Sequence, residues 1–232
     1  MIGWLIIGTH KYFELGLECI ESIRKNYKGQ HEQRYFFFTD RTDEVDDDGI
    51  ETIHVEHETF PYISMRRYRH FTNHKELLSE TDYLFYIDAD MKFEDVGDEI
   101  LEHRVATRHP GFWRTHPDHC TFDRNPQCNA YVPYGYMGPY FQNCFQGSET
   151  QEFLQMSELL ATRTDEDLSK GIIPLWHDES HMNKYMSENP PTKILDPGYA
   201  YCKHLEKEFA LDTNFSIKVW SLDKDHAEIR SD

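Results

Sequence analysis

The 232-residue sequence is short of basic residues. Its 24 Lys and Arg stand against 42 Asp and Glu, and the formal net charge is −18. Nucleic acids and anionic lipid surfaces attract basic faces, and a chain with this excess of acids cannot supply one. We therefore expect neither among its partners. An anionic substrate would need local help from a metal ion or from a few well-placed Arg and Lys side chains.

Long apolar segments and targeting signals are absent as well. No run approaches the ~18 apolar residues that a transmembrane helix needs. The N-terminus lacks the basic start and the apolar stretch of a secretory signal peptide. The sequence also contains no internal repeat and no low-complexity segment. These absences predict a soluble, cytoplasmic protein without a transmembrane anchor.

Cysteine is scarce: the chain has five, which is an odd number. Their spacing matches no zinc-binding pattern. We interpret them as free, buried thiols of a protein in a reducing compartment. They are Cys19, Cys120, Cys128, Cys144 and Cys202.

Aromatic residues, in contrast, make up 14% of the chain, which is ample material for the core of one domain of this length. Short apolar runs alternate with segments of helical periodicity over the first 90 or so residues. This alternation predicts an α/β protein with a parallel, Rossmann-like sheet. The expected strands are 2–7, 35–39, 50–55 and 83–87, and the expected helices are 15–26 and 64–78.

The second half of the chain is less regular. Residues 106–147 hold most of the Pro, Gly, Cys and aromatic residues and predict loops, turns and short strands. Residues 151–163 have the pattern of a helix, and a second helix follows position 177 and ends near 189, before two prolines. A strand is expected at 192–195. The last 17 residues show little periodicity, which is typical of a mobile tail.

One buried strand is expected to carry polar side chains to a site. The run Tyr83–Ile87 leads directly into Asp88-Ala89-Asp90. Ligands of open α/β sheets bind beyond the carboxyl ends of the strands. Two carboxylates two residues apart can share Mg²⁺ or Mn²⁺ and leave coordination positions open for phosphate oxygens. The alternative is a strand-end turn with two exposed acids.

Three other Asp-x-Asp sequences follow no such strand. They occur at Asp46/Asp48, Asp165/Asp167 and Asp223/Asp225. We interpret all three as solvated acidic loops.

The segment from His177 to His181 brings together His, Asp and Glu. Two His residues four apart suggest a zinc helix, but that motif places Glu directly after the first His. Glu179 is two residues on, about 200° around a helix, so it would face away from the metal. Glu179 is better suited to face the reacting carbon of a sugar, as nucleophile or as stabiliser of an oxocarbenium-like transition state. The simpler alternative is an acid that interacts with a helix dipole.

These segments together resemble glycosyltransferase family 6, which contains the blood-group A and B transferases and the α-1,3-galactosyltransferase. The similarity is longest at 177–185 and 191–195, and it extends to 83–90, 122–124 and 130–135. It spans nearly the whole chain, although the first 60 residues match loosely. Without the N-terminal anchor and stem of the eukaryotic members, the chain resembles a bacterial or viral catalytic domain.

The resemblance implies a GT-A fold: a Rossmann-like mixed sheet flanked by helices, in a single catalytic domain with a flexible C-terminal tail. Residues 1–90 would form the nucleotide-binding half, 91–215 the acceptor and catalytic half, and 216–232 a lid. The implied reaction is a retaining transfer of galactose or N-acetylgalactosamine from a UDP-sugar to the 3-OH of a galactoside, in α-1,3 linkage. The acceptor would be an oligosaccharide or glycoconjugate.

The resemblance also implies a role for each site residue. Asp88 and Asp90 would hold Mn²⁺ on the UDP diphosphate, and because both acids are retained we expect metal dependence. Glu179 would be the catalytic carboxylate, either in a front-face departure of UDP or through a glycosyl-enzyme. The implied donor-binding residues are Ile7, Gly8, Thr9, Tyr12, Arg67, Ala89, Lys224 and Arg230, and those near the transferred or accepting sugar are Gln142, Asn143, Cys144, Trp176, His177 and Asp178.

The chain departs from the family at the positions that choose the donor. Cys144 is larger than the Gly or Ala that leaves room for an N-acetyl group, and the region around Gly111-Phe112-Trp113 differs from the mammalian pattern. The donor sugar and the acceptor therefore stay open at this stage. Two other functions compete: a UDP-sugar hydrolase with a diverged acceptor site, and a non-catalytic sugar-binding module. Retention of Asp88, Asp90 and Glu179 together argues against the binding module, because binding alone needs no such trio.

Overall fold

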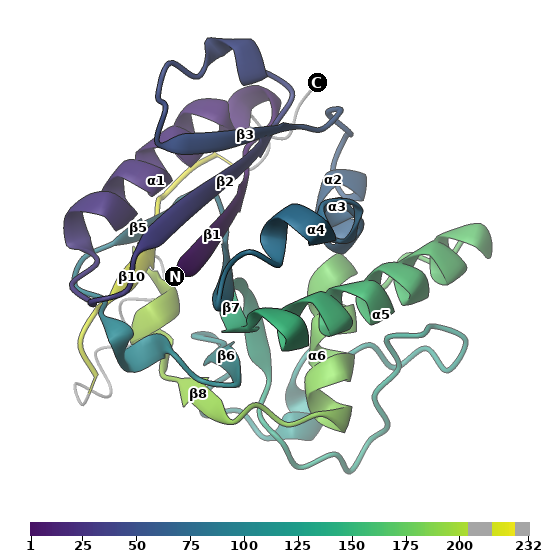
Figure 1. The fold of residues 1–232 in the computed structure, drawn as a ribbon. Helices are drawn as coiled ribbons and strands as arrows, with labels where there is room; N and C mark the ends of the chain where they lie inside the picture. Colours follow the sequence, from purple (N-terminus) through teal and green to yellow (C-terminus); the bar gives the residue numbers. More distant parts are fainter. Residues whose placement is uncertain (204–214, 226–232) are drawn as a thin grey trace.

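The structure is a computed structural model, and it describes residues 1–203 and 215–225. Its main sheet has seven strands in the order β3-β2-β1-β4-β7-β6-β8 (Figure 1). The first four strands in that order are parallel, β7 is antiparallel to both of its neighbours, and β8 is parallel to β6. The strands of this sheet are β1 (Ile2–Ile7), β2 (Gln33–Thr39), β3 (Ile50–His54), β4 (Tyr83–Ile87), β6 (Arg104–Arg108), β7 (Phe141–Glu149) and β8 (Lys193–Leu195). The prediction of a mixed α/β sheet in one domain is thus confirmed, and so is a parallel sheet in the first half.

A smaller sheet of three strands lies beside the main one. In it β10 (Val219–Ser221) pairs antiparallel with β5 (Met91–Phe93) and parallel with β9 (Tyr201–Cys202). Sequence periodicity predicted an irregular tail from residue 216 on. That prediction is wrong for β10, because Val219 is fully buried and a three-residue strand is too short to show a period. Residues 226–232 of the expected lid lie outside the described residues.

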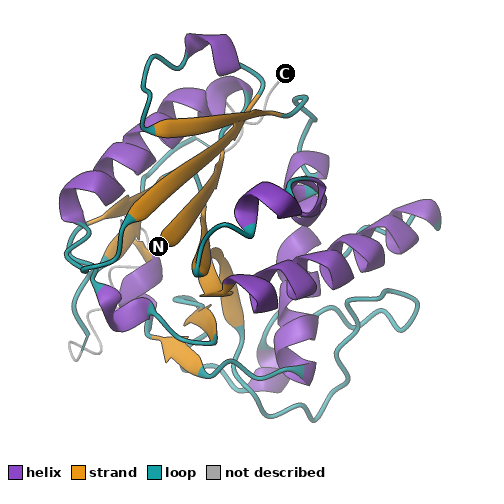
Figure 2. Ribbon diagram, in the orientation of Figure 1, coloured by secondary structure: helices purple, strands orange, loops and turns teal. Residues whose placement is uncertain are grey.

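The helices cover both faces of the main sheet (Figure 2). On one face lies α1 (Phe13–Asn26), and on the other lie α3 (Arg67–Asn73), α5 (Thr150–Ser169) and α6 (His177–Glu188). Strand β4 shows why the sheet is buried on both sides: Phe85 and Ile87 pack on the α1 side, and Leu84 and Tyr86 pack on the opposite side. A continuous apolar run is the expected sequence of such a strand.

Two predicted helices differ from the structure. The segment 64–78 is not one helix but three short ones, because the backbone leaves helical geometry at Arg66 and again at His74. These are α2 (Tyr62–Met65), α3 and α4 (Lys75–Leu78). Helix α5 continues six residues beyond the predicted end at 163. These residues are mostly polar and show no apolar periodicity that would indicate a helix.

Asp167, near the end of α5, is fully buried, so its assignment to a solvated loop is wrong. The backbone N–H of Asn129 donates to its carboxylate at 3.0 Å, and the thiol of Cys128 donates at 3.2 Å. These donors compensate for the desolvation of the charge. Both come from a distant loop, which no local sequence pattern could indicate.

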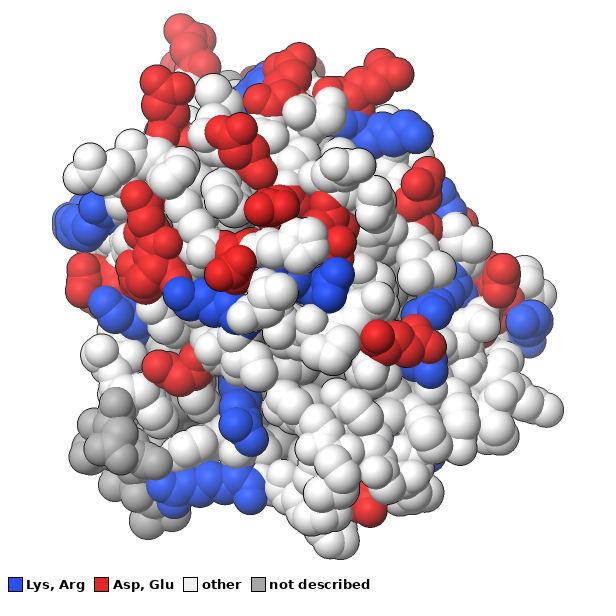
Figure 3. Space-filling model, turned by 60° about the horizontal axis from the view of Figure 1, so that its bottom comes forward, with Lys and Arg blue, Asp and Glu red and all other residues white. Residues whose placement is uncertain are grey.

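All five cysteines lie in the described residues and none forms a disulfide. Four of them are buried and Cys202 is half-buried, which largely confirms the expectation of free buried thiols. Among the described helices, none combines the length and the apolar character needed to cross a membrane. On the face drawn in Figure 3, acidic side chains gather mainly in the upper half and the lower half is largely uncharged.

Candidate active site

A cleft opens beyond the carboxyl ends of β1 and β4. Eight of the predicted donor- and metal-binding residues line it, and they come from four separate parts of the chain. They are Ile7, Thr9, Tyr12, Arg67, Asp88, Ala89, Asp90 and Lys224.

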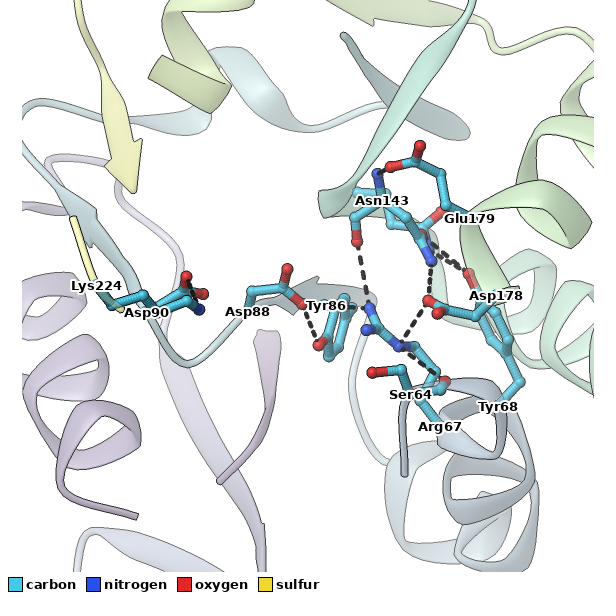
Figure 4. A network of polar contacts seen from close by, with 11 residues as sticks. Ser64, Arg67, Tyr68, Tyr86, Asp88, Asp90, Asn143, Asp178, Glu179 and Lys224 are labelled. Carbon is cyan, nitrogen blue, oxygen red and sulfur yellow. Dashed lines mark hydrogen bonds and ion pairs between the residues drawn. The ribbon is translucent and has the colours of Figure 1, made fainter. Parts of the chain in front are cut away.

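The two acids after β4 differ in their surroundings. Asp88 is about one third exposed and accepts a hydrogen bond of 2.5 Å from the hydroxyl of Tyr86. Burial of its surroundings raises the pKa of Asp88, against the attraction of Arg67. Asp90 is buried and forms an ion pair with Lys224 (Figure 4). The ammonium of Lys224 also lies 4.7 Å from the centre of the Tyr12 ring.

Arg67 connects the acids of the two halves of the chain. Its side chain is buried, and its guanidinium lies 3.3 Å from Asp88 Oδ1 and 3.0 Å from Asp178 Oδ2. It also donates to the backbone carbonyl of Asn143 at 3.3 Å and lies over the ring of Tyr86, 4.2 Å from its centre. A planar guanidinium suits this arrangement because its donors point in several fixed directions.

Glu179 lies in the first turn of α6, opposite the start of β7. Its Oε1 accepts from the hydroxyl of Tyr140 at 2.8 Å, and its Oε2 accepts from the backbone N–H of Asn143 at 3.1 Å. Burial raises the pKa of Glu179 to about 7, although both donors favour the charged form. Burial likewise raises the pKa of Asp178 to about 6, against the attraction of Arg67.

The charges of this network leave an excess of two negative units when all its groups are ionised. Four carboxylates face two cations, Arg67 and Lys224. A divalent cation would balance that excess, and oxygen donors such as Asp88 and Asp90 are the ligands that Mg²⁺ and Mn²⁺ prefer. Within 1–203 and 215–225, no group of three or more His, Cys, Asp and Glu is arranged to hold a metal ion. The residues therefore fit a cation that takes its remaining ligands from substrate phosphate and water.

Gly8 is the one predicted donor-binding residue of the turn after β1 that does not line the cleft. A Cβ at this position would lie 2.6 Å from the ring of Phe37 and 2.9 Å from the carbonyl oxygen of Tyr12. The structure thus explains this glycine by the close packing of the turn against β2.

Sequence reasoning missed His57 and Phe60, which line the cleft from the segment between β3 and α2. His57 Nδ1 lies 2.9 Å from the hydroxyl of Thr9, and the ring of Phe60 meets the ring of His177 edge-on at 4.8 Å. This segment thus touches both ends of the site. The only local signal was Phe60 itself, an apolar residue in a polar stretch.

The residues expected near the sugars occupy different environments. Asn143 and Cys144 are buried, Gln142 is half-buried, and Trp176 is 49% exposed beside the start of α6. The side chain of Cys144 belongs to the core cluster on the α1 side. Arg230 lies outside the described residues.

The second histidine of the zinc-like segment is remote from this chemistry. His181 is fully buried, and its Nε2 lies 3.5 Å from Asp167 Oδ2. This placement agrees with the rejection of a zinc site that uses His177 and His181 together.

Sequence comparison with known proteins assigns this chain to a family. A family profile described as "Glycosyltransferase family 6" matches residues 1–231. The chain is 33% identical over 215 residues to histo-blood group ABO system transferase 2 of Rattus norvegicus, an alignment that covers 88% of this chain and 64% of that protein. It is 25% identical over 240 residues to globoside alpha-1,3-N-acetylgalactosaminyltransferase 1 of Gallus gallus, covering 99% and 69%.

A bacterial protein is similar as well. The chain is 27% identical over 206 residues to the O-antigen biosynthesis glycosyltransferase WbnI of Escherichia coli, covering 84% of this chain and 85% of that protein. The chain thus spans less than two thirds of the ABO transferase of the rat, and most of the bacterial relative. A match over nearly every residue, on a mixed α/β sheet consistent with the GT-A fold, leads to one conclusion: the chain belongs to glycosyltransferase family 6.

Proposed function

We propose that this protein transfers galactose or N-acetylgalactosamine from a UDP-sugar to the 3-OH of a galactoside, with retention at the anomeric carbon and with Mn²⁺ as cofactor. The observation that carries the proposal is the continuous network from Asp88 through Arg67 and Asn143 to Glu179. It joins a cleft lined by Asp88, Asp90, Arg67 and Lys224 to a carboxylate suited to a developing positive charge. The relatives' names, which specify ABO and α-1,3-N-acetylgalactosaminyl transfer, support the choice of sugars.

The nucleotide end of the cleft is suited to a base and a ribose. The ring of Tyr12 offers an aromatic surface, and Thr9 and His57 offer polar atoms. Lys224 lies between this end and the acids, where an ammonium can stabilise a departing diphosphate. A divalent cation on Asp88 and Asp90 would supply further charge for the same leaving group.

The sugar end is organised by Asp178 and Glu179. Asp178 is anchored by Arg67 and can accept a hydrogen bond from a sugar hydroxyl. The carboxylate of Glu179 can stabilise the positive charge that develops on the anomeric carbon as UDP leaves. The hydroxyl of Tyr140 and the N–H of Asn143 donate to this carboxylate and restrict the rotation of its side chain. Glu179 therefore needs little reorganisation in the transition state.

The first test is release of UDP from a panel of UDP-sugars, with Mn²⁺ or with EDTA, and with or without a β-galactoside acceptor. We expect release from UDP-galactose or UDP-N-acetylgalactosamine that needs Mn²⁺ and rises with acceptor. Linkage and anomeric configuration of the product can then be read by NMR. Undiminished release in EDTA would contradict the metal role of Asp88 and Asp90, and release that no acceptor raises would favour the UDP-sugar hydrolase.

A further inference from the structure

Strand β7 is irregular where it passes the site. Ala106 of β6 pairs with Gln146, whereas the next residue, Thr107, pairs with Gln142. Three residues of β7, 143–145, thus have no counterpart on β6. Such bulges bend a strand and redirect its side chains, and they are common beside active sites.

The three backbone carbonyls of this bulge accept hydrogen bonds from Arg67, from Asp88 and from Thr107 of β6. The carbonyl of Asn143 accepts from Arg67, and the carbonyl of Cys144 accepts from the N–H of Asp88 at 2.9 Å. The carbonyl of Phe145 accepts from the hydroxyl of Thr107 at 2.7 Å. Because buried backbone groups must be paired, these contacts hold the bulge in one geometry.

Asn143 makes the most contacts of the three. Its backbone N–H donates to Glu179 Oε2, and its side-chain Nδ2 donates to Asp178 Oδ2 at 2.6 Å (Figure 4). One residue therefore donates to both acids at the sugar end of the site. It is itself only 4% exposed.

A buried pair behind Asn143 sets the direction of its amide. Tyr68 donates through its hydroxyl to Asn143 Oδ1 at 3.1 Å, and Gln146 Nε2 donates to the same oxygen at 2.6 Å. Gln146 Nε2 also donates to the hydroxyl of Tyr68 at 2.7 Å. The reversed amide would place two acceptors against each other at Asp178, so both ends of Asn143 select the same orientation.

We propose that Asn143 is a positioning residue for the sugar transfer: its two N–H donors hold Asp178 and Glu179 in their working geometry, and Tyr68 and Gln146 keep its amide turned toward Asp178. The proposal rests on the function proposed above. It assigns Asn143 no contact with the sugar, although sequence comparison placed this residue among the sugar-binding candidates.

Other charged and titratable groups also face the two acids, and the test must separate their effects from that of Asn143. They are Arg67 and Tyr68 from α3, Tyr86 and Asp88 from the end of β4, Tyr140 before β7, and Cys144 within it. All of them stay in place in the variants at position 143.

Two substitutions separate shape from hydrogen bonding. Asn143→Asp keeps the shape of the side chain but replaces the Nδ2 donor by an acceptor that faces Asp178. We expect turnover to fall about 100-fold, as for a small misplacement of reacting groups, with a smaller change in the KM for the donor. Asn143→Ala should be less harmful than Asn143→Asp, because it adds no repulsion. Equal activity of Asn143→Asp and the unmodified protein would overturn the proposal.

The pH profile gives a readout that a purely structural role would not change. Asn143→Ala removes the Nδ2 donor to Asp178 but keeps the backbone N–H that donates to Glu179. Loss of the Nδ2 donor raises the pKa of Asp178, so the step of the acid limb that belongs to Asp178 should move up by about one pH unit. Asn183→Ala is the matched control, since the Asn183 side chain joins the same helix to the same strand through backbone groups of Phe141 and Glu179 alone. We expect no shift of the acid limb there. An equal shift in both variants would mean that only the alignment of α6 and β7 matters.

A measurement without substrate keeps this proposal separate from the proposed function. Urea unfolding of each variant at pH 5 and pH 8 compares states in which the two acids of the folded protein are mostly protonated or mostly ionised. The loss of unfolding free energy in Asn143→Ala should be larger at pH 8, because the Nδ2 donor that it removes acts on a charged Asp178 there. The loss in Asn183→Ala should not depend on pH. An equal loss of unfolding free energy in Asn143→Ala at both pH values would refute the positioning role. Absence of transfer by the unmodified protein would refute the proposed function alone.

Discussion

At the scale of single residues, burial decides the chemistry of the acids. Glu179 is held by Tyr140 and by the N–H of Asn143, and Asp178 is held by Arg67. Both acids have a raised pKa because the protein replaces water around them by few polar groups. Such an acid is already positioned in the free protein, so its carboxylate can stabilise a cationic transition state.

Substitution of Glu179 by Gln should separate catalysis from donor binding. The amide keeps the size of the side chain but loses the charge that stabilises the transition state, so we expect turnover to fall by roughly 10²–10³-fold. Binding of UDP, measured by calorimetry, should be nearly unchanged. Glu188→Gln, on the same helix but in surface ion pairs, is the control and should keep activity within a few-fold. Full turnover of Glu179→Gln would mean that the catalytic assignment is wrong.

The pH dependence of turnover follows from the same acid. Burial raises the pKa of Glu179 to about 7, and the charged form is the one that stabilises a developing cation. Turnover at saturating donor should therefore rise as the pH increases from 6 to 8, with a midpoint near that pKa. Stability should change in the opposite direction: the folded protein binds more protons than the unfolded chain below the raised pKa, so it loses stability as the pH rises through it. A flat rate profile from pH 5.5 to 8 would contradict the role of a charged Glu179.

At the scale of elements, strand β10 and Lys224 show how the C-terminal segment enters the site. Strand β10 is inserted between β5 and β9, and the N–H of Leu222 donates to the carbonyl of Asp90 at 2.8 Å. These bonds bring Lys224 to the acid pair. The part of the segment before Lys224 thus belongs to the fold, and Lys224 belongs to the site.

Two truncations should distinguish these parts. Removal of residues 224–232 is expected to lower turnover sharply, because a cation that stabilises the leaving group is lost, while the melting temperature stays close to that of the full chain. Removal of residues 218–232 also deletes β10 and with it Val219, whose side chain is fully buried. This truncation should therefore lower the free energy of unfolding by about 2 kcal/mol or more. Unchanged kinetics of the shorter truncation would refute the role of Lys224 in the site.

At the scale of the whole molecule, the two halves inferred from the sequence share one sheet. All five residues of β4 pair with β7, and the rings of Phe85 and Phe145 lie 5.8 Å apart. The site is built across this junction, since Arg67 and Asp88 come from the first half and Asp178 and Glu179 from the second. The nucleotide-binding and catalytic halves are therefore expected to fold as one unit.

A fragment of residues 1–90 should for that reason not fold alone. It would expose the edge of β4 that pairs with β7 and the apolar surface that α5 and α6 cover. An unpaired apolar edge strand favours aggregation over folding. We expect no cooperative thermal transition and poor dispersion of amide NMR signals for the fragment. For the full chain we expect a cooperative transition and well-dispersed signals. A cooperative transition of the fragment would show that the first half is an independent domain.

The sequence by itself determined the features that are local. Continuous apolar runs identified β1, β2 and β4, because a strand buried on both faces needs them. The strand-end position of Asp88 and Asp90 followed from the same run. The segment around Glu179 was recognisable because its residues lie together along one turn of helix.

Only the tertiary structure decided which of these residues meet. The antiparallel placement of β7 beside β4 brings the bulge at 143–145 to Asp88, Arg67 and Glu179. The burial of Asp167 and the pairing of β10 likewise depend on partners far away in the chain. Such contacts leave no local period, because the energy of a strand pair or a buried carboxylate is set by the groups that surround it after folding.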